Sequence, residues 1–339
     1  MELLVTIIIL ALIFDYINGF HDAANSIATI VSTKVLTPFQ AVLWAAFFNF
    51  VAFFIAKYII GSFGIANTVS KTVVEQYITL PIILAGIIAA ISWNLITWWK
   101  GIPSSSSHTL IGGFAGAAIM ANGFEAIQLN IILKIAAFIF LAPFIGMVIA
   151  FGFTLLVLYI CRRANPHTAE MWFKRLQLVS SAMFSVGHGL NDSQKVMAPD
   201  IVPSEIAVKQ ENATQSGRSE ILFIPIPRPI EWAAIIAAAM GGWKIVKTMG
   251  TRITKVTPLE GMVAETAGAF TLYITEMLKI PVSTTHTITG AIIGVGATKR
   301  LSAVRWGVTK SLMTAWVLTI PVSGLLAACI YCVVSLFLK

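Results

Sequence analysis

The sequence is poor in charged residues. Only 11% of its 339 residues are Asp, Glu, Lys or Arg, whereas 57% are hydrophobic. A soluble domain carries about 25% charged residues, so this chain lacks the residues for a water-facing surface and must face lipid. Its length allows about 10 to 12 membrane segments of ~20 residues each. The sequence therefore predicts an all-α integral membrane protein whose outer surface contacts the lipid bilayer.

Cysteine and acidic residues are also scarce. Cys161, Cys329 and Cys332 lack the second pair that metal-ligand spacing requires, so we interpret them as incidental thiols. The N-terminal stretch has neither a basic region nor a small-residue cleavage site, which indicates a first membrane span instead of a signal peptide. The net charge of +8 indicates basic cytoplasmic loops rather than a nucleic-acid partner.

The basic residues fall into three clusters. Predicted loops at 161–175, 244–255 and 299–310 hold 12 of the 23 Lys and Arg residues, with Glu170 as their only acid. Since Lys and Arg accumulate in cytoplasmic loops, we expect all three on the cytoplasmic side of a multi-pass protein of the cell membrane. The polar, proline-rich segment 199–229 is expected to form an extramembrane loop.

The chain resembles itself. NGFHDAANSIA (18–28) aligns with HGLNDSQKVMA (188–198), and IPSSSSHTLIGGFAG (102–116) aligns with IPVSTTHTITGAIIG (280–294), with nearly the same offset in both cases. Duplicated halves with polar interruptions at matching positions are typical of transporters whose site lies where helices break. An odd number of crossings in each half would invert the second. We therefore expect two inverted repeats with broken or re-entrant helices, residues 1–160 and 176–339, joined by the loop 161–175.

The first acidic motif predicts a cation site. Asp15, Asn18, Asp22 and Asn25 are three or four residues apart and share one face of a helix. A carboxylate inside a membrane is costly, which makes Asp22 a functional candidate. Carboxylate and amide oxygens suit Na⁺, and an Asp whose pKa is raised by burial carries a proton. The alternative is a polar seam that joins helices.

The second acidic motif repeats this pattern with one change. Asn191 and Asp192 correspond to the His–Asp pair of the first copy, and Lys195 stands where the first copy has Asn25. We predict cation coupling through Asp22, Asn25, Asn191 and Asp192, with a Na⁺ site at Asp22, Asn25 and Asp192 and with Lys195 as a charge partner. Gly19 and Gly189 allow a helix break or a close backbone approach.

Two hydroxyl motifs predict an anion site. The first is PSSSSHT (103–109) and the second is PVSTTHT (281–287). Proline favours the start of a helix, and the free N–H groups of a helix N-terminus attract anions. Ordinary capping is the alternative for a single copy. The predicted ligand is a tetrahedral oxyanion, held by Ser105, Ser106, Ser107, Thr109, Ser283, Thr284, Thr285 and Thr287. His21, His108 and His286 are candidate substrate contacts or proton carriers, or structural histidines.

These motifs resemble the inorganic phosphate transporter (PiT) family, as do GGWKIVKTMGTRITKVTPLEG (241–261) and RLSAVRWGV (300–308). The resemblance covers nearly the whole chain except 199–229. It implies a phosphate symporter of two inverted repeats, driven by H⁺ or Na⁺, with both hydroxyl motifs and Asp22, Asn25 and Asp192 lining the central site. Some relatives move sulfate or metal–phosphate complexes. The sequence departs from the family after DSQKVMA, where PDIVPSEIAVKQ replaces an apolar stretch.

Other functions are compatible with the same residues. A sulfate permease of this architecture and an anion channel remain alternatives to a phosphate symporter. An enzyme is not expected, because Ser107 and His108 are sequence neighbours that a helix turns about 100° apart. No cofactor is expected beyond the co-transported cation, and a homodimer is compatible with the sequence without being required by it.

Overall fold

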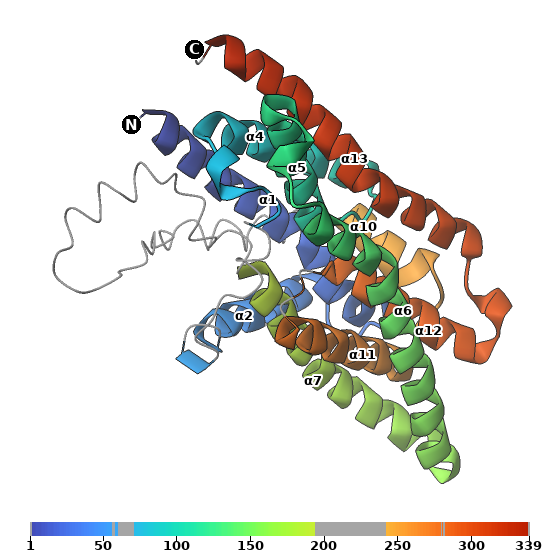
Figure 1. Cartoon of the computed structure of the whole chain (residues 1–339). Coiled ribbons are helices and arrows are strands. Elements are labelled where there is room, and N and C mark those ends of the chain that lie inside the picture. Colours follow the sequence, from blue (N-terminus) through green and yellow to red (C-terminus); the bar gives the residue numbers. More distant parts are fainter. Residues whose placement is uncertain are drawn as a thin grey trace.

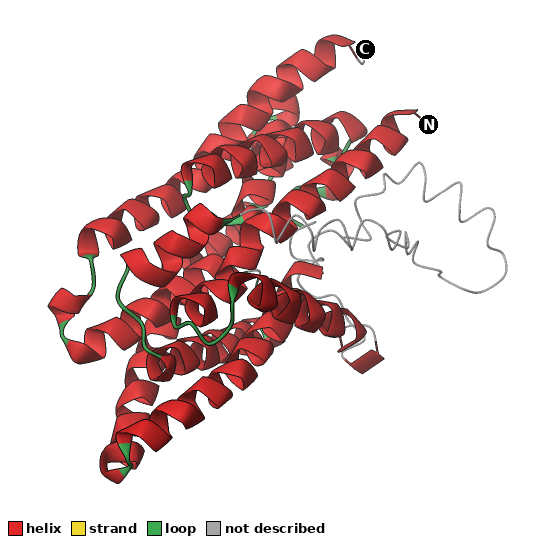
Figure 2. Cartoon of the chain, turned by 180° about the vertical axis from the view of Figure 1, so that it is seen from behind, coloured by secondary structure: helices red, strands yellow, loops and turns green. Residues whose placement is uncertain are grey.

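The computed structural model describes residues 2–55, 58–59, 71–193, 242–278, 280 and 282–337. Within these ranges the chain is almost entirely helical (Figure 2), and an isolated bridge between Val73 and Ile127 is the β pairing that they contain. The prediction of an all-α fold is therefore confirmed. Lys195, Pro281 and the predicted loop 199–229 lie outside the described residues.

The helices of the first half lie before residue 161 (Figure 1). They are α1 (Glu2–Ser32), α2 (Pro38–Ile55), α4 (Leu80–Lys100), α5 (Ser106–Asn122) and α6 (Leu129–Ile160). The second half contains α7 (Pro166–Ser193), α10 (Trp243–Lys247), α11 (Pro258–Met277), α12 (Thr284–Lys299) and α13 (Trp306–Phe337). Short turns connect them: η2 (Glu75–Tyr77), η3 (Phe124–Ala126), η4 (Cys161–Arg163), the π-helical η6 (Thr248–Arg252) and η7 (Leu301–Ala303).

Four helices in the described part of the chain are long and apolar enough to cross a membrane. They are Glu2–Ser32, Leu80–Lys100, Leu129–Arg163 and Trp306–Phe337. On the third of them, Phe140, Phe144, Val148 and Phe151 are all exposed on the outer surface. Such a surface is stable against lipid and not against water. The chain is therefore an integral membrane protein, while its total number of membrane segments and the inversion of its second half stay predictions.

The prediction of a loop over 161–175 is wrong in its local structure. A short turn ends at Asn165, whose Oδ1 accepts a hydrogen bond of 3.0 Å from the backbone two residues later, and α7 begins at Pro166. Asn before a helix and Pro at its first position both favour a helix start. Lys174 lies on this helix and pairs with Glu170 at 2.8 Å. Basic residues bear on membrane side and not on secondary structure, and the cytoplasmic position of this segment stays a prediction.

The segment 244–255 is also not an open loop. It forms α10 and η6, and its residues Ile245, Met249 and Ile253 are fully buried. A Cβ added at Gly250 would lie 2.5 Å from the carbonyl oxygen of Ala28 in α1. This segment therefore packs directly against α1, because apolar residues between its Lys and Arg residues give it a buried face.

Two of the basic clusters lie side by side. The ammonium group of Lys299 pairs with Glu260 at 2.6 Å and donates to the carbonyl oxygen of Lys255 at 3.2 Å. The backbone N–H of Arg305 donates to the carbonyl oxygen of Ile253 at 2.9 Å. The segments 244–255 and 299–310 therefore share one end of the molecule, as a common membrane side requires.

Corresponding helices of the two halves make corresponding contacts. Helix α5 packs along α13, and α12 packs along α6; α4 contacts both α5 and α13, just as α11 contacts both α12 and α6. Each half-helix thus packs against the long helix of the other half. Pro143 in α6 and Pro321 in α13 occupy equivalent positions, because they are related by the same offset as the hydroxyl motifs. The internal repeat is therefore visible in the packing as well as in the sequence.

Glycine allows these helix pairs to approach closely, which gives a first prediction. A Cβ at Gly290 of α12 would overlap the carbonyl oxygen of Pro143 in α6. We expect Gly290→Ala to lower the stability of the folded protein by about 1–3 kcal/mol, the usual cost of overpacking. The thermal midpoint of the detergent-solubilised protein measures this. Gly152→Ala in α6 is the control, because its Cβ would meet nothing within 4 Å; equal midpoints for the two variants would contradict the close contact.

The buried apolar side chains form two large cores. One combines α4 and α5 with the N-terminal half of α1, including Ile7 and Phe14. The other combines α2, α6, α7, α11 and α12 with the C-terminal half of α1, including Ile27 and Ile30. The buried polar residues of α1 between Asn18 and Asn25 lie where one core gives way to the other. The fold therefore places a polar site between two separately packed bodies.

Candidate functional site

The acidic stripe lies on a continuous helix. Helix α1 runs from Glu2 to Ser32 without a break at Gly19, and Asn18, Asp22 and Asn25 are each at most 3% exposed. Helix α7 also continues past Gly189, where an added Cβ would lie 2.7 Å from that of Ala52. Neither glycine marks a helix break, and at Gly189 the structure uses glycine for close approach between helices.

The helix breaks lie at the hydroxyl motifs. Helix α4 ends at Gly101, whose φ of 68° is readily adopted only by glycine. Helix α5 then starts after Ser105, whose Oγ accepts from the backbone N–H of His108 at 3.3 Å, and α12 starts after Ser283, whose Oγ accepts from that of His286 at 3.3 Å. The first N–H groups of a helix have no carbonyl partner within it. Both helices therefore present a positive N-terminal end.

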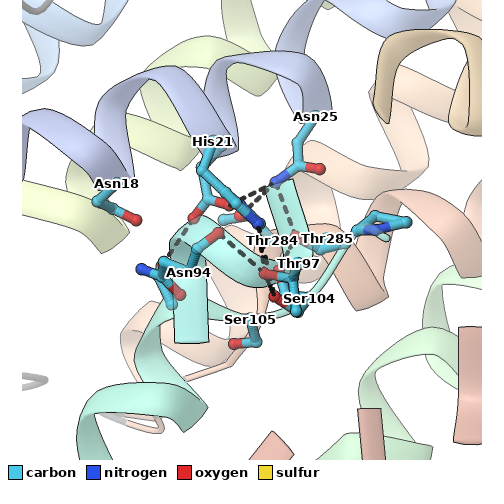
Figure 3. Close-up of polar contacts among 12 residues, drawn as sticks. Asn18, His21, Asn25, Asn94, Thr97, Ser104, Ser105, Thr284 and Thr285 are labelled. Carbon is cyan, nitrogen blue, oxygen red and sulfur yellow. Dashed lines mark hydrogen bonds and ion pairs between the residues drawn. The ribbon is translucent and has the colours of Figure 1, made fainter. Parts of the chain in front are cut away.

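Both N-terminal ends meet the stripe on α1 (Figure 3). From the first motif, the Ser106 hydroxyl donates to Asp22 at 2.8 Å. From the second, the Thr285 hydroxyl accepts from the Asn25 amide at 2.8 Å and donates to the carbonyl oxygen of Ser104 at 3.2 Å. Side chains from opposite ends of the sequence thus share one buried polar cluster. The structure brings together the two motifs that the sequence placed in different halves.

The eight predicted hydroxyls do not play equal parts. Ser105 and Ser283 are the caps. Thr109 donates to the carbonyl oxygen of Ser105 at 2.8 Å, and Thr287 donates to that of Ser283 at 3.0 Å. These two threonines use their O–H protons inside the helix, so in this arrangement they have none to donate to an oxyanion.

The four hydroxyls of the first helical residues are better placed. Ser106, Ser107, Thr284 and Thr285 are each at most 2% exposed. Thr284 Oγ1 lies 3.5 Å from the Asn25 amide nitrogen. The Ser107 hydroxyl has no hydrogen-bond partner among the described residues. Ser106, Thr284 and Thr285 therefore form the part of the two motifs that contacts the stripe on α1.

Each motif aspartate has a histidine beside it. His21 Nδ1 lies 3.0 Å from Asp22 Oδ1, and its Nε2 lies 3.3 Å from the Thr97 hydroxyl. His188 Nδ1 lies 3.5 Å from Asp192 Oδ2. The two copies carry His and Asn in opposite order, since residues 18 and 21 are Asn and His whereas residues 188 and 191 are His and Asn. Sequence reasoning did not select His188, although this exchange is visible in the aligned motifs.

The second acidic motif lies next to the first. Asn18, one helical turn before Asp22, donates to Asp192 Oδ2 at 3.3 Å. Asn191 is 1% exposed, and its side-chain nitrogen and oxygen have no partner within the described ranges. The side chain of Asp192 is 16% exposed, whereas that of Asp22 is 3% exposed. Asp22 and Asp192 therefore belong to neighbouring parts of one polar region.

Sequence reasoning missed a second buried carboxylate, Glu265 of α11, which is 0% exposed. It accepts hydrogen bonds from Thr29 of α1 at 2.6 Å and from Gln177 and Ser180 of α7 at 3.1 and 2.5 Å. These bonds connect three helices beside the site. An acid inside the apolar stretch 262–279 was the signal that could have found it. Asn94 of α4, also fully buried, was missed as well; it is drawn with the cluster in Figure 3, and its backbone carbonyl oxygen accepts from the Thr97 hydroxyl at 3.1 Å.

A buried polar cluster between two helix N-termini, inside a bundle that faces lipid, defines a membrane transport protein rather than an enzyme. The chain belongs to the phosphate transporter family, whose model matches residues 18–327.

Its relatives cover almost its whole length. A probable low-affinity inorganic phosphate transporter of Rhizobium meliloti (strain 1021) is 47% identical over 97% of this chain and 96% of its own. One of Bacillus subtilis (strain 168) is 41% identical over 98% of each chain. A solved structure titled as the sodium-dependent phosphate transporter matches 99% of this chain and 100% of its own with a TM-score of 0.79 and 24% identity. That similarity confirms the fold.

Proposed function

We propose that this protein is a secondary active transporter that carries inorganic phosphate across the cell membrane together with H⁺ or Na⁺. The observation that carries the proposal is the meeting of two helix N-termini with a buried carboxylate. Ser106 donates to Asp22, and Thr285 accepts from Asn25 while contacting Ser104. The printed names of the relatives in Rhizobium meliloti and Bacillus subtilis, both inorganic phosphate transporters, support phosphate as the substrate.

The anion side of the site consists of weak donors. Hydroxyl groups and helix N-termini surround it, and the described contacts of the cluster include no Lys or Arg. An arginine fork would hold a phosphate group with strong, charge-assisted bonds. Hydroxyls and backbone N–H groups suit a ligand that must be released in every transport cycle.

The cation side follows from charge. A phosphate anion next to Asp22 places two negative charges in a region of low dielectric constant, which is unfavourable unless a cation enters with it. Asp22 and Asp192 supply carboxylate oxygens for Na⁺. Asn25 supplies an amide oxygen, which is buried and has no hydrogen-bond partner among the described residues. The same carboxylates with His21 or His188 suit a proton. Sodium dependence belongs to the solved relative by its title and is one of the two alternatives here.

Alternating access is the mechanism that the packing supports. The site is buried. Its residues on α1, which are Asn18, His21, Asp22 and Asn25, are each at most 3% exposed. A channel needs a continuous aqueous path, whereas an occluded site between two apolar cores opens when one core moves against the other. Movement of the α4–α5 core relative to the α6–α11–α12 core would expose the site to one side and then the other.

The test is uptake of radiolabelled phosphate and sulfate into proteoliposomes, with Na⁺ and H⁺ gradients imposed separately. We expect phosphate to accumulate against its own gradient when one of the two cation gradients is present, and sulfate to be a poor substrate. Protein-free liposomes are the control. Flux that ignores both cation gradients would identify a channel, and faster sulfate uptake would identify a sulfate permease.

A further inference from the structure

One side chain of α13 contacts both hydroxyl motifs. The indole Nε1–H of Trp316 donates to the carbonyl oxygen of Pro103, in the first motif, at 3.0 Å. Its ring lies against the imidazole of His286, in the second motif, with centroids 4.2 Å apart and planes 30° apart. Trp316 is 1% exposed. A single rigid group therefore connects two segments that lie in different halves of the sequence.

The ring contacts continue to the first half-helix. The His286 imidazole lies 5.1 Å from that of His108, measured between centroids. His108 and His286 hold equivalent positions in α5 and α12, so the row Trp316–His286–His108 runs from one motif to the other. His286 is 0% exposed, and neither of its ring nitrogens has a hydrogen-bond partner among the described residues. Ring packing, not hydrogen bonding, therefore fixes the position of this side chain.

The bond to Pro103 stabilises the break in the backbone. Pro103 is buried between the end of α4 and the start of α5, where its carbonyl oxygen has no helical N–H to accept from. A buried carbonyl without a donor is unfavourable. The indole N–H supplies that donor and thereby fixes the entry to the first half-helix relative to α13.

Trp316 is itself held firmly. Helix α13 packs closely on α5 near Ser323, where a Cβ at Gly112 would lie 2.6 Å from the carbonyl oxygen of Ile320. This contact fixes α13 relative to α5. In α6 the position equivalent to Trp316, counted back from the matching proline, is Phe138, whose side chain has no N–H group. The connection through an indole is therefore a property of one half only.

We propose that Trp316 is a positioning residue that sets the separation of the two half-helix N-termini and thereby selects oxyanions by size. The proposal rests on the proposed phosphate site. The indole N–H of Trp316 is hydrogen-bonded to Pro103 of the first motif, and the face of its ring packs against His286 of the second motif. Because buried rings pack at crystal-like density, the distance between the two motifs follows the width of this side chain. Arsenate is the suitable probe, since it has the charge and protonation of phosphate but longer bonds to oxygen.

The experiment compares Trp316→Phe and Trp316→Leu with the unmodified protein in proteoliposomes. Trp316→Phe keeps a ring against His286 and loses the N–H; Trp316→Leu loses both. We expect the phosphate KM to rise roughly 3- to 10-fold in Trp316→Phe, as for the loss of one hydrogen bond, and further in Trp316→Leu. The maximal rate should change much less. The ratio of the arsenate inhibition constant to the phosphate KM should rise in both variants, because a narrower side chain lets the two motifs move closer and the larger arsenate then fits less well.

The control is Trp306→Phe on the same helix. Trp306 also donates its indole N–H to a backbone carbonyl, that of Leu301 at 2.8 Å, but it is 49% exposed and lies at the start of α13. If Trp316→Leu does not fold, the arsenate-to-phosphate ratio of Trp316→Phe alone tests the positioning role. An unchanged arsenate-to-phosphate ratio in Trp316→Phe would overturn the positioning role while leaving phosphate transport intact. Failure of the proposed function would show in the unmodified protein instead, as absence of phosphate uptake.

Discussion

Replacing Asp22 with asparagine is expected to abolish cation-coupled phosphate uptake. The Asp22 carboxylate is 2% exposed and accepts from Ser106 at 2.8 Å and from Asn25 at 3.3 Å. Asparagine has nearly the same shape, but it carries no charge, and its NH₂ group would face donors. Removing one partner of a buried, hydrogen-bonded charge costs about 2–5 kcal/mol, which corresponds to roughly 30-fold or more. The initial rate of phosphate uptake into proteoliposomes measures the effect.

Asp15→Asn is the matched control for this variant. The sequence placed Asp15 on the same polar face, but it lies seven residues before Asp22, about 10 Å away along the axis. It is also partly exposed, unlike the buried Asn18, Asp22 and Asn25, so it is not part of the buried cluster. We expect its uptake rate to stay close to that of the unmodified protein. Equal thermal midpoints for both variants would show that the loss in Asp22→Asn is not a folding defect.

The second aspartate extends the same test. Asp192 binds Asn18 at 3.3 Å, one turn from Asp22, so Asp192→Asn should also reduce uptake sharply. Because both carboxylates are assigned to the cation, the loss should appear mainly as weaker dependence on the imposed cation gradient. Normal transport by both variants would show that the central-site model is wrong.

The parts of the site that the sequence predicted are those with local signals. Proline near Ser or Thr favours a nearby helix start. Helices do begin in both motifs, but at Ser106 and Thr284, three residues after the predicted proline positions, with Ser105 and Ser283 as the caps. Duplication made the two motifs stand out, since one copy alone reads as an ordinary cap. Their meeting in space followed from the expected pairing of equivalent repeats, and the bond between Thr285 and Ser104 confirms it.

The parts that escaped prediction depend on tertiary packing. Thr109 and Thr287 looked like anion ligands, but each donates its O–H to the preceding turn, and this depends on a rotamer that the sequence does not specify. Trp316 is one of many apolar residues in a long membrane helix, and its role follows from the ring and the carbonyl that it contacts. Glu265 was visible as an isolated acid, but it lies outside the duplicated motifs on which the prediction of the site depended.

The prediction of a loop at 161–175 was wrong for another reason. Positive charge near the membrane predicts which side a segment occupies, and it does not distinguish a loop from the first turns of a helix. Long basic side chains at a helix end extend toward water while their stems remain on the apolar surface. Arg175 lies within α7, with its guanidinium 5.4 Å from the centre of the Trp172 ring, so it is a helix residue and not part of a loop. The capping signal at Asn165 and Pro166 was the better local predictor.

Thr285→Val is the second variant for which we expect a large effect. Thr285 Oγ1 is the atom that connects α1 with both hydroxyl motifs, because it accepts from Asn25 at 2.8 Å and donates to Ser104 at 3.2 Å. Valine has the same shape and lacks the hydroxyl. Leaving buried polar partners unsatisfied costs about 1–3 kcal/mol, so the phosphate KM should rise about 10-fold or more. Concentration-dependent uptake measures it, and Thr285→Ser should restore much of the affinity.

Thr289→Val separates this role from a general need for buried hydroxyls. Thr289 lies one turn further along α12, is equally buried, and donates to the carbonyl oxygen of Thr285 at 2.7 Å. Its loss should lower the thermal midpoint about as much as Thr285→Val, because each variant removes one buried hydroxyl. Its phosphate KM should stay near that of the unmodified protein, since its O–H points along the helix and not into the site. Equal KM values for the two valine variants would show that Thr285 contributes to stability alone, and the two half-helices would then need another atom to connect them to α1.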